Sequence, residues 1–225
     1  DLQKKMAAHL AAAIKTPMAG YPAYSLLTGF IGTAWISKAL SDNGMSEEAY
    51  RLLQYEGYPS WLYPVKNGAT TIWERLNSYT VKDGFGENNS MNSFNHYSFG
   101  AVASWMYNYS LGICRDEKSP GFKHFILKPE VDPTRGITHA EGYYDSMYDR
   151  IRSRWQYTDS GIRYEFTVPA NTTASLYLPA PAVSFISENG KPLKKASGVR
   201  YVSADKELHH LELASGSYQF DIKQK

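Results

Sequence analysis

The sequence predicts an α+β protein, in which a helical N-terminal part is followed by an antiparallel β-sandwich. Before about residue 112, apolar residues recur with the 3.6-residue period of amphipathic helices. After about residue 120, short runs alternate apolar and polar residues and are separated by Pro, Gly, Asn and Asp, which is typical of strands. Of the 225 residues, 43% are hydrophobic and 14% are aromatic, so the chain can bury a substantial core.

The first half of the chain is expected to begin with three helices. Residues 1–15 are alanine-rich, and their apolar run is too short and too interrupted for a signal peptide, so we expect a helix already under way in a longer protein. Residues 23–40 follow a helical period. Gly44 suits the position just after that helix, Ser46 suits the N-cap of the next one, and Gly57 should end it.

Two loops and a long helix complete this half. Residues 58–72 are punctuated by prolines and glycine, and residues 78–93 are rich in Gly, Asn and Ser, so both should be loops. Loops of this length in a compact domain are usually functional. Residues 94–112 again show a helical stripe. We therefore expect a helical domain over residues 1–112, a linker over 113–121 and a β-sandwich over 122–225.

Composition excludes several classes of protein. The net charge is +2, from 24 basic and 22 acidic residues mixed along the chain, so no nucleic-acid face is expected. No apolar stretch approaches the roughly 20 residues that span a bilayer. Cys114 is the single cysteine, which rules out an internal disulfide. His209 and His210 would face opposite sides of a strand, and with no metal or phosphate-loop motif we expect no metal and no cofactor.

Glu74, in the stretch Gly68–Arg75 that reads GATTIWER, is the first candidate for chemistry. Thr71 and Glu74 have the spacing of a capping box, in which the glutamate would merely start a helix. However, only a few residues separate Glu74 from the next loop, so any such helix is barely a turn long. An acid on a short turn between two long loops also suits a cleft, and both roles remain open at this point.

His96 is the second candidate. It should lie in the first turn of the long helix, after Asn92 or Ser93 as N-cap. A helix N-terminus disfavours the charged imidazolium, and a neutral imidazole can exchange hydrogen bonds with a sugar hydroxyl. A purely structural histidine is the alternative. Trp73 is expected in the core, while Trp61 is equally suited to the core or to the wall of a sugar site.

Four stretches, residues 57–79, 88–113, 120–129 and 168–179, resemble the C-terminal part of the bacterial α-L-rhamnosidases of the inverting type. The resemblance runs from about residue 20 to 180. One departure is visible at Leu76, where many members of that family have a second tryptophan. Glu74 remains in register with the family motif.

The resemblance implies that residues 1 to about 112 are the closing helices of an (α/α)6 barrel. It implies that Glu74 is the general base and His96 a substrate-binding residue for a rhamnose-containing glycoside. The family's general acid has no matching stretch here and is expected outside this chain. The chain alone should then be inactive, and helices that lack their barrel partners should promote a homo-oligomer.

Two other classes of function remain alternatives. The sandwich and its aromatic residues could form a non-catalytic carbohydrate-binding module, or the whole chain could be a structural adaptor. A large loss of rate on Glu74→Gln in the full-length protein, with folding intact, would reject the adaptor. The sequence does not decide between export and retention in the cell.

Overall fold

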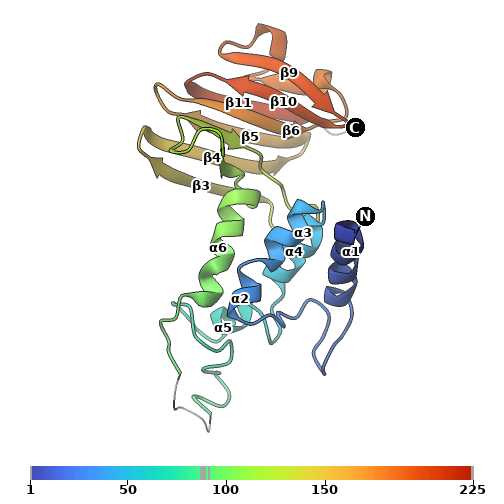
Figure 1. Cartoon of the computed structure of the whole chain (residues 1–225), viewed down its shortest axis with the longest axis vertical. Helices are drawn as coiled ribbons and strands as arrows, with labels where there is room; N and C mark the ends of the chain where they lie inside the picture. Colours follow the sequence, from blue (N-terminus) through green and yellow to red (C-terminus); the bar gives the residue numbers. More distant parts are fainter. Residues whose placement is uncertain (1, 87–89, 91, 224–225) are drawn as a thin grey trace. The chain divides into compact units, whose positions relative to one another are not determined.

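The structure is a computed structural model that describes residues 2–86, 90 and 92–223. These described residues fall into two compact units, one within residues 1–105 and 132–136 and the other within residues 106–131 and 137–225. The first unit is helical and the second is built from strands (Figure 1). The mixture of helix and sheet confirms the predicted class at this level.

Short helices connected by long loops make up the first unit (Figure 1). They are α1 (Leu2–Ile14), α2 (Phe30–Thr33), α3 (Ile36–Asp42), α4 (Ser46–Gln54), α5 (Leu62–Lys66), the 3₁₀ turn η1 (Ser98–Ala101) and α6 (Val102–Trp105). Their core includes Tyr50 and Trp105, whose rings meet edge to face at 5.0 Å. The indole N–H of Trp105 donates to the hydroxyl of Ser41 at 2.9 Å, so its polar atom is satisfied where it is buried.

The predicted helix over residues 23–40 is wrong in its first part. Helical structure begins only at Phe30 and breaks again before Ile36. Tyr24 has a positive φ of 62°, which a helix cannot accommodate. The predicted loop over residues 58–72 is also wrong in part, because α5 lies within it.

Of the predicted helix ends, one is confirmed and two are wrong. Gly44 has φ of 73°, and its N–H bonds to the carbonyl of Ser41, which confirms it as the residue that follows α3. Ser46 is the first residue of α4 rather than its cap, and its hydroxyl bonds to that of Ser41 at 2.8 Å. The helix ends at Gln54, before the predicted stop at Gly57.

The predicted helix over residues 94–112 begins at Ser98 and continues through η1 and α6 to a π-helical turn, η2 (Met106–Ser110), in the second unit. In this segment Val102 and Trp105 are buried, whereas Tyr97 and Met106 are exposed. The predicted loop over residues 78–93 is described only in part, because residues 87–89 and 91 lie outside the described residues.

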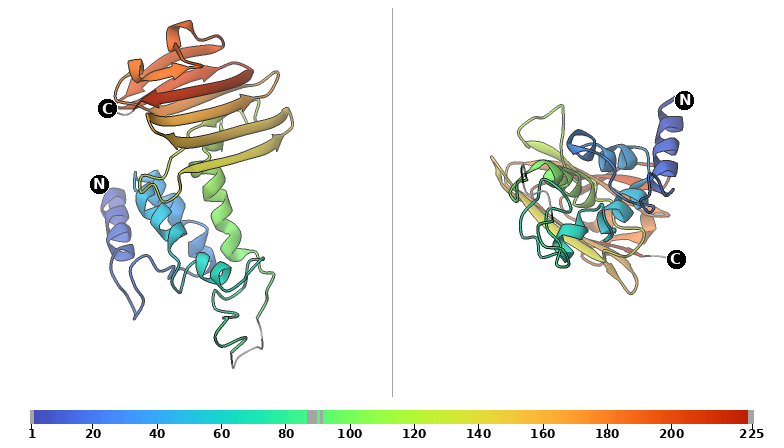
Figure 2. Two further views of the ribbon diagram at one scale, coloured as in Figure 1. Left: turned by 180° about the vertical axis from the view of Figure 1, so that it is seen from behind. Right: turned by 90° about the horizontal axis from the view of Figure 1, so that it is seen from below.

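In the second unit, the described strands form two sheets (Figure 2). The first sheet has the order β1 (Ile113–Arg115), β2 (His124–Leu127), β6 (Thr173–Pro179), β10 (Leu208–Leu213), β9 (Val199–Asp205). The second has the order β3 (His139–Ser146), β4 (Asp149–Thr158), β5 (Gly161–Val168), β11 (Gly216–Lys223), β7 (Ile186–Glu188), β8 (Lys191–Pro192). Short 3₁₀ turns, η3 (Val183–Phe185) and η4 (Leu193–Lys195), flank β7 and β8.

Both sheets bury alternate residues, as expected for layers that pack face to face. Along β5 and β10 buried and partly exposed side chains alternate, so period two in the sequence predicts the buried face. The core between the sheets includes Phe125, Leu176, Trp155, Tyr164 and Phe220, all with no exposed surface. The pairing is antiparallel except between β2 and β6, which run parallel.

The segment predicted as a linker, residues 113–121, contains β1, which pairs with β2 from Ile113 to Arg115. The reason is that Ile113 is buried and continues the first sheet, although only three residues of it are strand. His209 is buried and His210 partly exposed, as expected for neighbours on one strand. No helix among the described residues is long and apolar enough to cross a membrane.

Candidate active site

Backbone hydrogen bonds hold the segment that carries Glu74 against the segment that carries His96. The N–H of His96 donates to the carbonyl of Ile72 at 2.7 Å, and the N–H of Glu74 donates to the carbonyl of Ser93 at 2.8 Å. The two stretches that the sequence singled out are therefore neighbours in the first unit, although a loop separates them in the chain.

The side chain of Glu74 is fixed by the same neighbouring segment. Its Oε2 accepts a hydrogen bond from the N–H of Ser93 at 2.9 Å, and the hydroxyl of Thr71 donates to the carbonyl of Phe94. Residues 71–74 form a bend and not a helix. The capping-box interpretation is therefore wrong, because both side chains bond across to residues 93–94 instead of to each other's backbone.

A cavity of about 480 Å³ lies beside Glu74. The carboxylate is half-buried at its wall, so it is open to small molecules yet held in place. The lining residues are Tyr21, Leu26, Leu27, Thr28, Gly29, Phe30, Tyr58, Pro59, Glu74, Arg75, Leu76, Asn77 and Phe99. Among these described residues Glu74 is the one acid and Arg75 the one base, so a single carboxylate serves this cavity.

His96 stands next to the same cavity through an aromatic stack. Its ring lies on that of Phe30, with centroids 4.7 Å apart, and Phe30 itself lines the cavity. Its Nδ1 accepts a hydrogen bond from the N–H of Ser98 at 3.4 Å. An accepting Nδ1 carries no hydrogen, so Nε2 bears the hydrogen of the neutral ring and can donate to a ligand.

The predicted place of His96 needs one correction. It precedes the first turn of the helix, which begins at Ser98, and does not lie within that turn. Asn92 and Ser93 are not its N-caps, because the N-cap is Tyr97. The imidazole reaches the helix start through its bond to Ser98, so a histidine takes the acceptor role that a serine or asparagine would usually fill.

The three other singled-out residues belong to the core. Trp73 is buried, as expected, and meets Phe94 edge to face at 5.2 Å. Trp61 is also buried, and its indole N–H donates to the carbonyl of Phe99 at 2.8 Å. Of its two predicted places, the core and the wall of a sugar site, Trp61 therefore occupies the core. Leu76, at the point of departure from the family motif, is buried as well, and it forms part of the cavity wall.

The sequence did not single out the aromatic residues that line the cavity with Glu74. The sequence predicted Phe30 within a helix and Tyr58 within a loop, without a role for either residue in a site. The two glycines at 29 and 32, on either side of Phe30, were the available signal of a broken helix. Burial raises the pKa of the Tyr58 phenol, with further contributions from Tyr21 and Tyr63, so this hydroxyl stays protonated at neutral pH.

Within the part of the chain that the structure describes, no group of three or more His, Cys, Asp or Glu residues is placed to hold a metal ion. The wall of the cavity carries one carboxylate, that of Glu74, and one guanidinium, that of Arg75, and the imidazole of His96 stacks on Phe30 beside it.

Comparison with known proteins finds family models for two parts of the chain. Residues 1–110 match the model of the bacterial alpha-L-rhamnosidase 6 hairpin glycosidase domain, and residues 112–192 match the model of the bacterial alpha-L-rhamnosidase C-terminal domain. These matches show that the chain is built from domains of a glycosidase. It belongs to the bacterial α-L-rhamnosidase family.

Curated relatives agree over most of the chain. An alpha-L-rhamnosidase of Alteromonas sp. (strain LOR) is 36% identical over 199 residues, which are 88% of this chain and 20% of the relative. One from Streptomyces avermitilis is 34% identical over 199 residues, or 88% of this chain and 18% of the relative. The chain thus spans about one fifth of the length of the curated relatives it matches.

Solved structures show the same fold. The Streptomyces avermitilis alpha-L-rhamnosidase complexed with L-rhamnose matches with a TM-score of 0.84 at 33% identity, over 99% of this chain and 20% of that one. The Aspergillus terreus enzyme matches with a TM-score of 0.74 at 26% identity, over 97% of this chain and 21% of that one.

Proposed function

We propose that this chain is part of an α-L-rhamnosidase that removes terminal α-L-rhamnose with inversion, and that Glu74 is its general base. The observation that carries the proposal is the position of Glu74. It is the one acid among the described residues lining the cavity, and a backbone N–H orients it. The name of the relatives and the L-rhamnose bound to one of them support a rhamnoside as substrate.

Inverting hydrolysis needs two carboxyl groups about 6.5–9.5 Å apart. One removes a proton from a water molecule, whose oxygen then attacks the anomeric carbon from the face opposite the leaving group. The other protonates the glycosidic oxygen as its bond to that carbon breaks. We assign the first role to Glu74: Ser93 holds Oε2, and Oε1 is the oxygen left to meet the water.

The general acid is proposed to come from polypeptide outside this chain. Glu74 has no second acid beside it among the described residues of the cavity wall, which supports this assignment. Residues 1–112 are proposed as the closing helices of an (α/α)6 barrel, in keeping with the six-hairpin domain model that matches residues 1–110. The remaining helices would then complete the pocket.

His96 is proposed to bind the sugar. A neutral ring whose Nδ1 accepts from Ser98 presents Nε2–H as a donor, which suits a ring hydroxyl of rhamnose. Phe30 supports the imidazole from one face and lines the cavity as well, so it fixes the direction of that donor. The phenol of Tyr58 adds a further hydroxyl at the cavity wall.

Glu74→Gln in the full-length protein tests the assignment. Loss of a general base typically lowers the rate by about 10²–10⁴-fold, so kcat on an aryl α-L-rhamnoside should fall by that factor with KM nearly unchanged. The matched control is Glu56→Gln, which removes an exposed acid that pairs with Lys66. An unchanged kcat for Glu74→Gln, or an equal loss in the control, would reject the general base.

Proton NMR of the first product tests the stereochemistry separately. If the mechanism inverts, β-L-rhamnose appears first and mutarotates later to the equilibrium mixture. Early release of the α-anomer would overturn the inverting assignment while leaving the rhamnosidase activity itself standing. The 225-residue chain alone is expected to release no rhamnose, because one carboxylate cannot serve both roles.

A further inference from the structure

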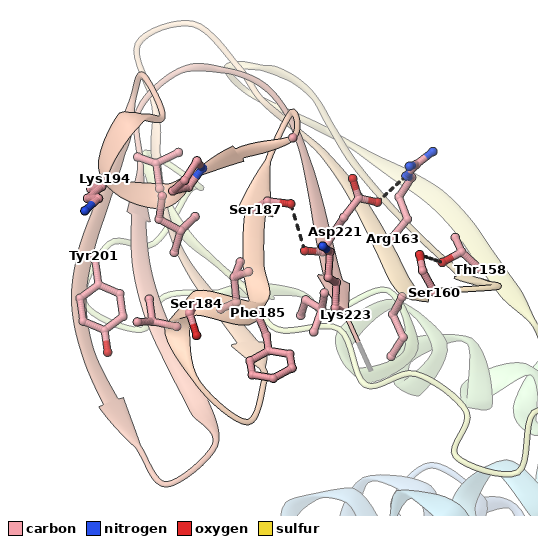
Figure 3. A pocket seen from close by; sticks show the side chains of 18 residues that line it. Thr158, Ser160, Arg163, Ser184, Phe185, Ser187, Lys194, Tyr201, Asp221 and Lys223 are labelled. Carbon is pink, nitrogen blue, oxygen red and sulfur yellow. Dashed lines mark hydrogen bonds and ion pairs between the residues drawn. The ribbon is translucent and has the colours of Figure 1, made fainter. Parts of the chain in front are cut away.

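A cavity of about 890 Å³, larger than the one beside Glu74, lies within the β-sandwich (Figure 3). Its walls come from β4, β5, β7, β8, β9 and β11 and from the turns η3 and η4. Its size falls in the range of about 300–1,000 Å³ that small-molecule sites occupy. All its lining residues belong to the second unit, so the cavity is separate from the site around Glu74.

An aromatic wall of the cavity is held rigidly. Tyr201 on β9 is 42% exposed, so its ring is available to a ligand. Its hydroxyl lies 3.4 Å from Nδ1 of the buried His209, and Nε2 of that ring lies 3.1 Å from the carbonyl of Ala180. A carbonyl only accepts, so Nε2 carries the hydrogen, and Nδ1 accepts from the tyrosine O–H. The ring of Tyr201 is thereby held in one orientation before any ligand binds.

Phe185 provides a second ring, from the turn η3, between Tyr201 and the residues of β5 and β11 (Figure 3). Two aromatic walls suit the CH-rich faces of sugar rings. The hydroxyls of Ser184 and Ser187 lie at the same cavity, where they can exchange hydrogen bonds with sugar hydroxyls. The hydroxyl of Ser187 already donates to the carbonyl of Asp221 at 3.5 Å, and its oxygen can still accept from a sugar hydroxyl.

The charge of the cavity is positive. Arg163, Lys194 and Lys223 line it, against one acid, Asp221. Nε of Arg163 donates to Oδ1 of Asp221 at 2.7 Å, so that pair is already neutralised, whereas both lysines are exposed. Two cations beside aromatic walls favour a ligand that carries carboxylate groups.

From this combination we propose that the sandwich cavity is a non-catalytic site for an acidic oligosaccharide, one whose sugar units carry carboxylates. The rings of Tyr201 and Phe185 pack on the sugar faces, and Lys194 and Lys223 pair with the carboxylates. This goes beyond the proposed hydrolysis, because the site would hold a polymer near the enzyme without cleaving it. It does not depend on Glu74.

The test is isothermal titration of the 225-residue chain with trigalacturonate, with maltotriose as the neutral saccharide of equal length. We expect saturable binding of the acidic trimer that weakens as salt is added, and at most weak binding of the neutral one. Equal binding of both trimers, or no binding to a chain whose circular dichroism shows folded strands, would overturn the proposal.

Variants locate the site. Lys194→Ala combined with Lys223→Ala should raise the Kd for trigalacturonate by at least about fivefold, since each exposed charge pair contributes little by itself. Lys195→Ala is the matched control, because Lys195 is an exposed lysine of the same turn outside the cavity. Tyr201→Ala should weaken binding by roughly tenfold. An equal effect of Lys195→Ala would place any binding elsewhere, and Glu74→Gln should change nothing, which separates this proposal from the hydrolytic one.

Discussion

At the scale of single residues, the carboxylate of Glu74 and the imidazole of His96 are positioned by backbone groups and not by other charged side chains. The N–H of Ser93 orients the carboxylate of Glu74, and the N–H of Ser98 fixes the tautomer of the imidazole of His96. Backbone donors cannot be removed by a side-chain substitution at these positions, so the geometry depends on the fold of residues 93–98. The candidate site is thus only as rigid as that segment.

His96→Ala in the full-length protein is expected to raise KM for an aryl α-L-rhamnoside by roughly tenfold, the value of one hydrogen bond, with a smaller change in kcat. His96 is proposed to bind the ground state and the transition state alike, so the loss should appear mainly in KM. Steady-state kinetics measure the split. His139→Ala, at an exposed histidine of β3, is the control, and a loss confined to kcat would contradict a binding role.

The motif singled out Glu74 as a candidate, but the local structure around it could not be predicted from the sequence. The Thr71–Glu74 spacing is a local pattern, and the partners that overrode it, Ser93 and Phe94, lie across a loop. Propensity rules use only residues that are near one another in the chain, so they cannot predict the pairing of two distant loops. For the same reason Phe30 and Tyr58 were missed, because they join the cavity only through the fold.

At the scale of elements, the strands were the better predicted part. Period-two burial along β5 and β10 follows directly from the sequence, whereas residues 23–29 show a helical period without forming a helix. β5 and β10 each pair with a strand on both sides, and there the pattern and the structure agree. The helices of the first unit are short, and tertiary contacts decide where they begin and end.

Gly112 lies where the chain enters the first sheet and tolerates no side chain. Its φ is 68°, and an added Cβ would come within 2.1 Å of the backbone nitrogen of Pro129. Gly112→Ala should therefore lower the free energy of unfolding by about 3 kcal/mol or more, from strain and overpacking together.

Gly190 offers the matched control for that substitution. Its φ is 73°, but a Cβ there would meet nothing within 4 Å. Gly190→Ala should cost only about 1–2 kcal/mol, the strain of the backbone conformation alone. Urea unfolding followed by circular dichroism compares the two, and equal losses would show that the clash at Gly112 is relieved by a shift of the chain.

The ionisation of Tyr218 on β11 should make the stability of the sandwich depend on pH in the alkaline range. Burial raises the pKa of its phenol above the ordinary value, with a smaller contribution from Glu188, and its hydroxyl donates to the carbonyl of Ala214 at 2.8 Å. The folded state binds this proton more tightly than the unfolded state. The stabilisation is therefore complete below the unfolded pKa of about 10 and is lost as pH rises through the raised folded pKa.

Melting temperatures between pH 8 and pH 12 measure that loss. Tyr218→Phe should melt lower at neutral pH, because the hydrogen bond to Ala214 is gone, yet decline less steeply above pH 10. Tyr144→Phe, at an exposed tyrosine of β3, controls for the removal of one phenol from the chain. A decline just as steep in Tyr218→Phe would mean that other groups cause the alkaline unfolding.

At the scale of the whole molecule, the two units differ in how completely they bury apolar surface. The sandwich encloses its large side chains, including Trp155, Tyr164 and Phe220. In the helical unit, Leu2 and Met6 of α1 are 72% and 63% exposed, and Ile31 and Trp35 are 84% and 60% exposed. Leu2 and Met6 lie four residues apart on α1 and so form one apolar patch, whereas Ile31 lies on α2 and Trp35 lies just before α3.

Such patches are expected to drive association of the 225-residue chain into a homo-oligomer through its helical unit. Size-exclusion chromatography with light scattering should show a mass that rises with concentration. Ile31→Ser combined with Trp35→Ser should shift the chain toward monomer, because these changes remove the most exposed pair of apolar side chains near α2. Met147→Ser is the control, since Met147 is 91% exposed but lies at the turn between β3 and β4. A compact monomer of the unsubstituted chain at all concentrations would contradict the association, and an equal shift by Met147→Ser would assign it to the sandwich instead.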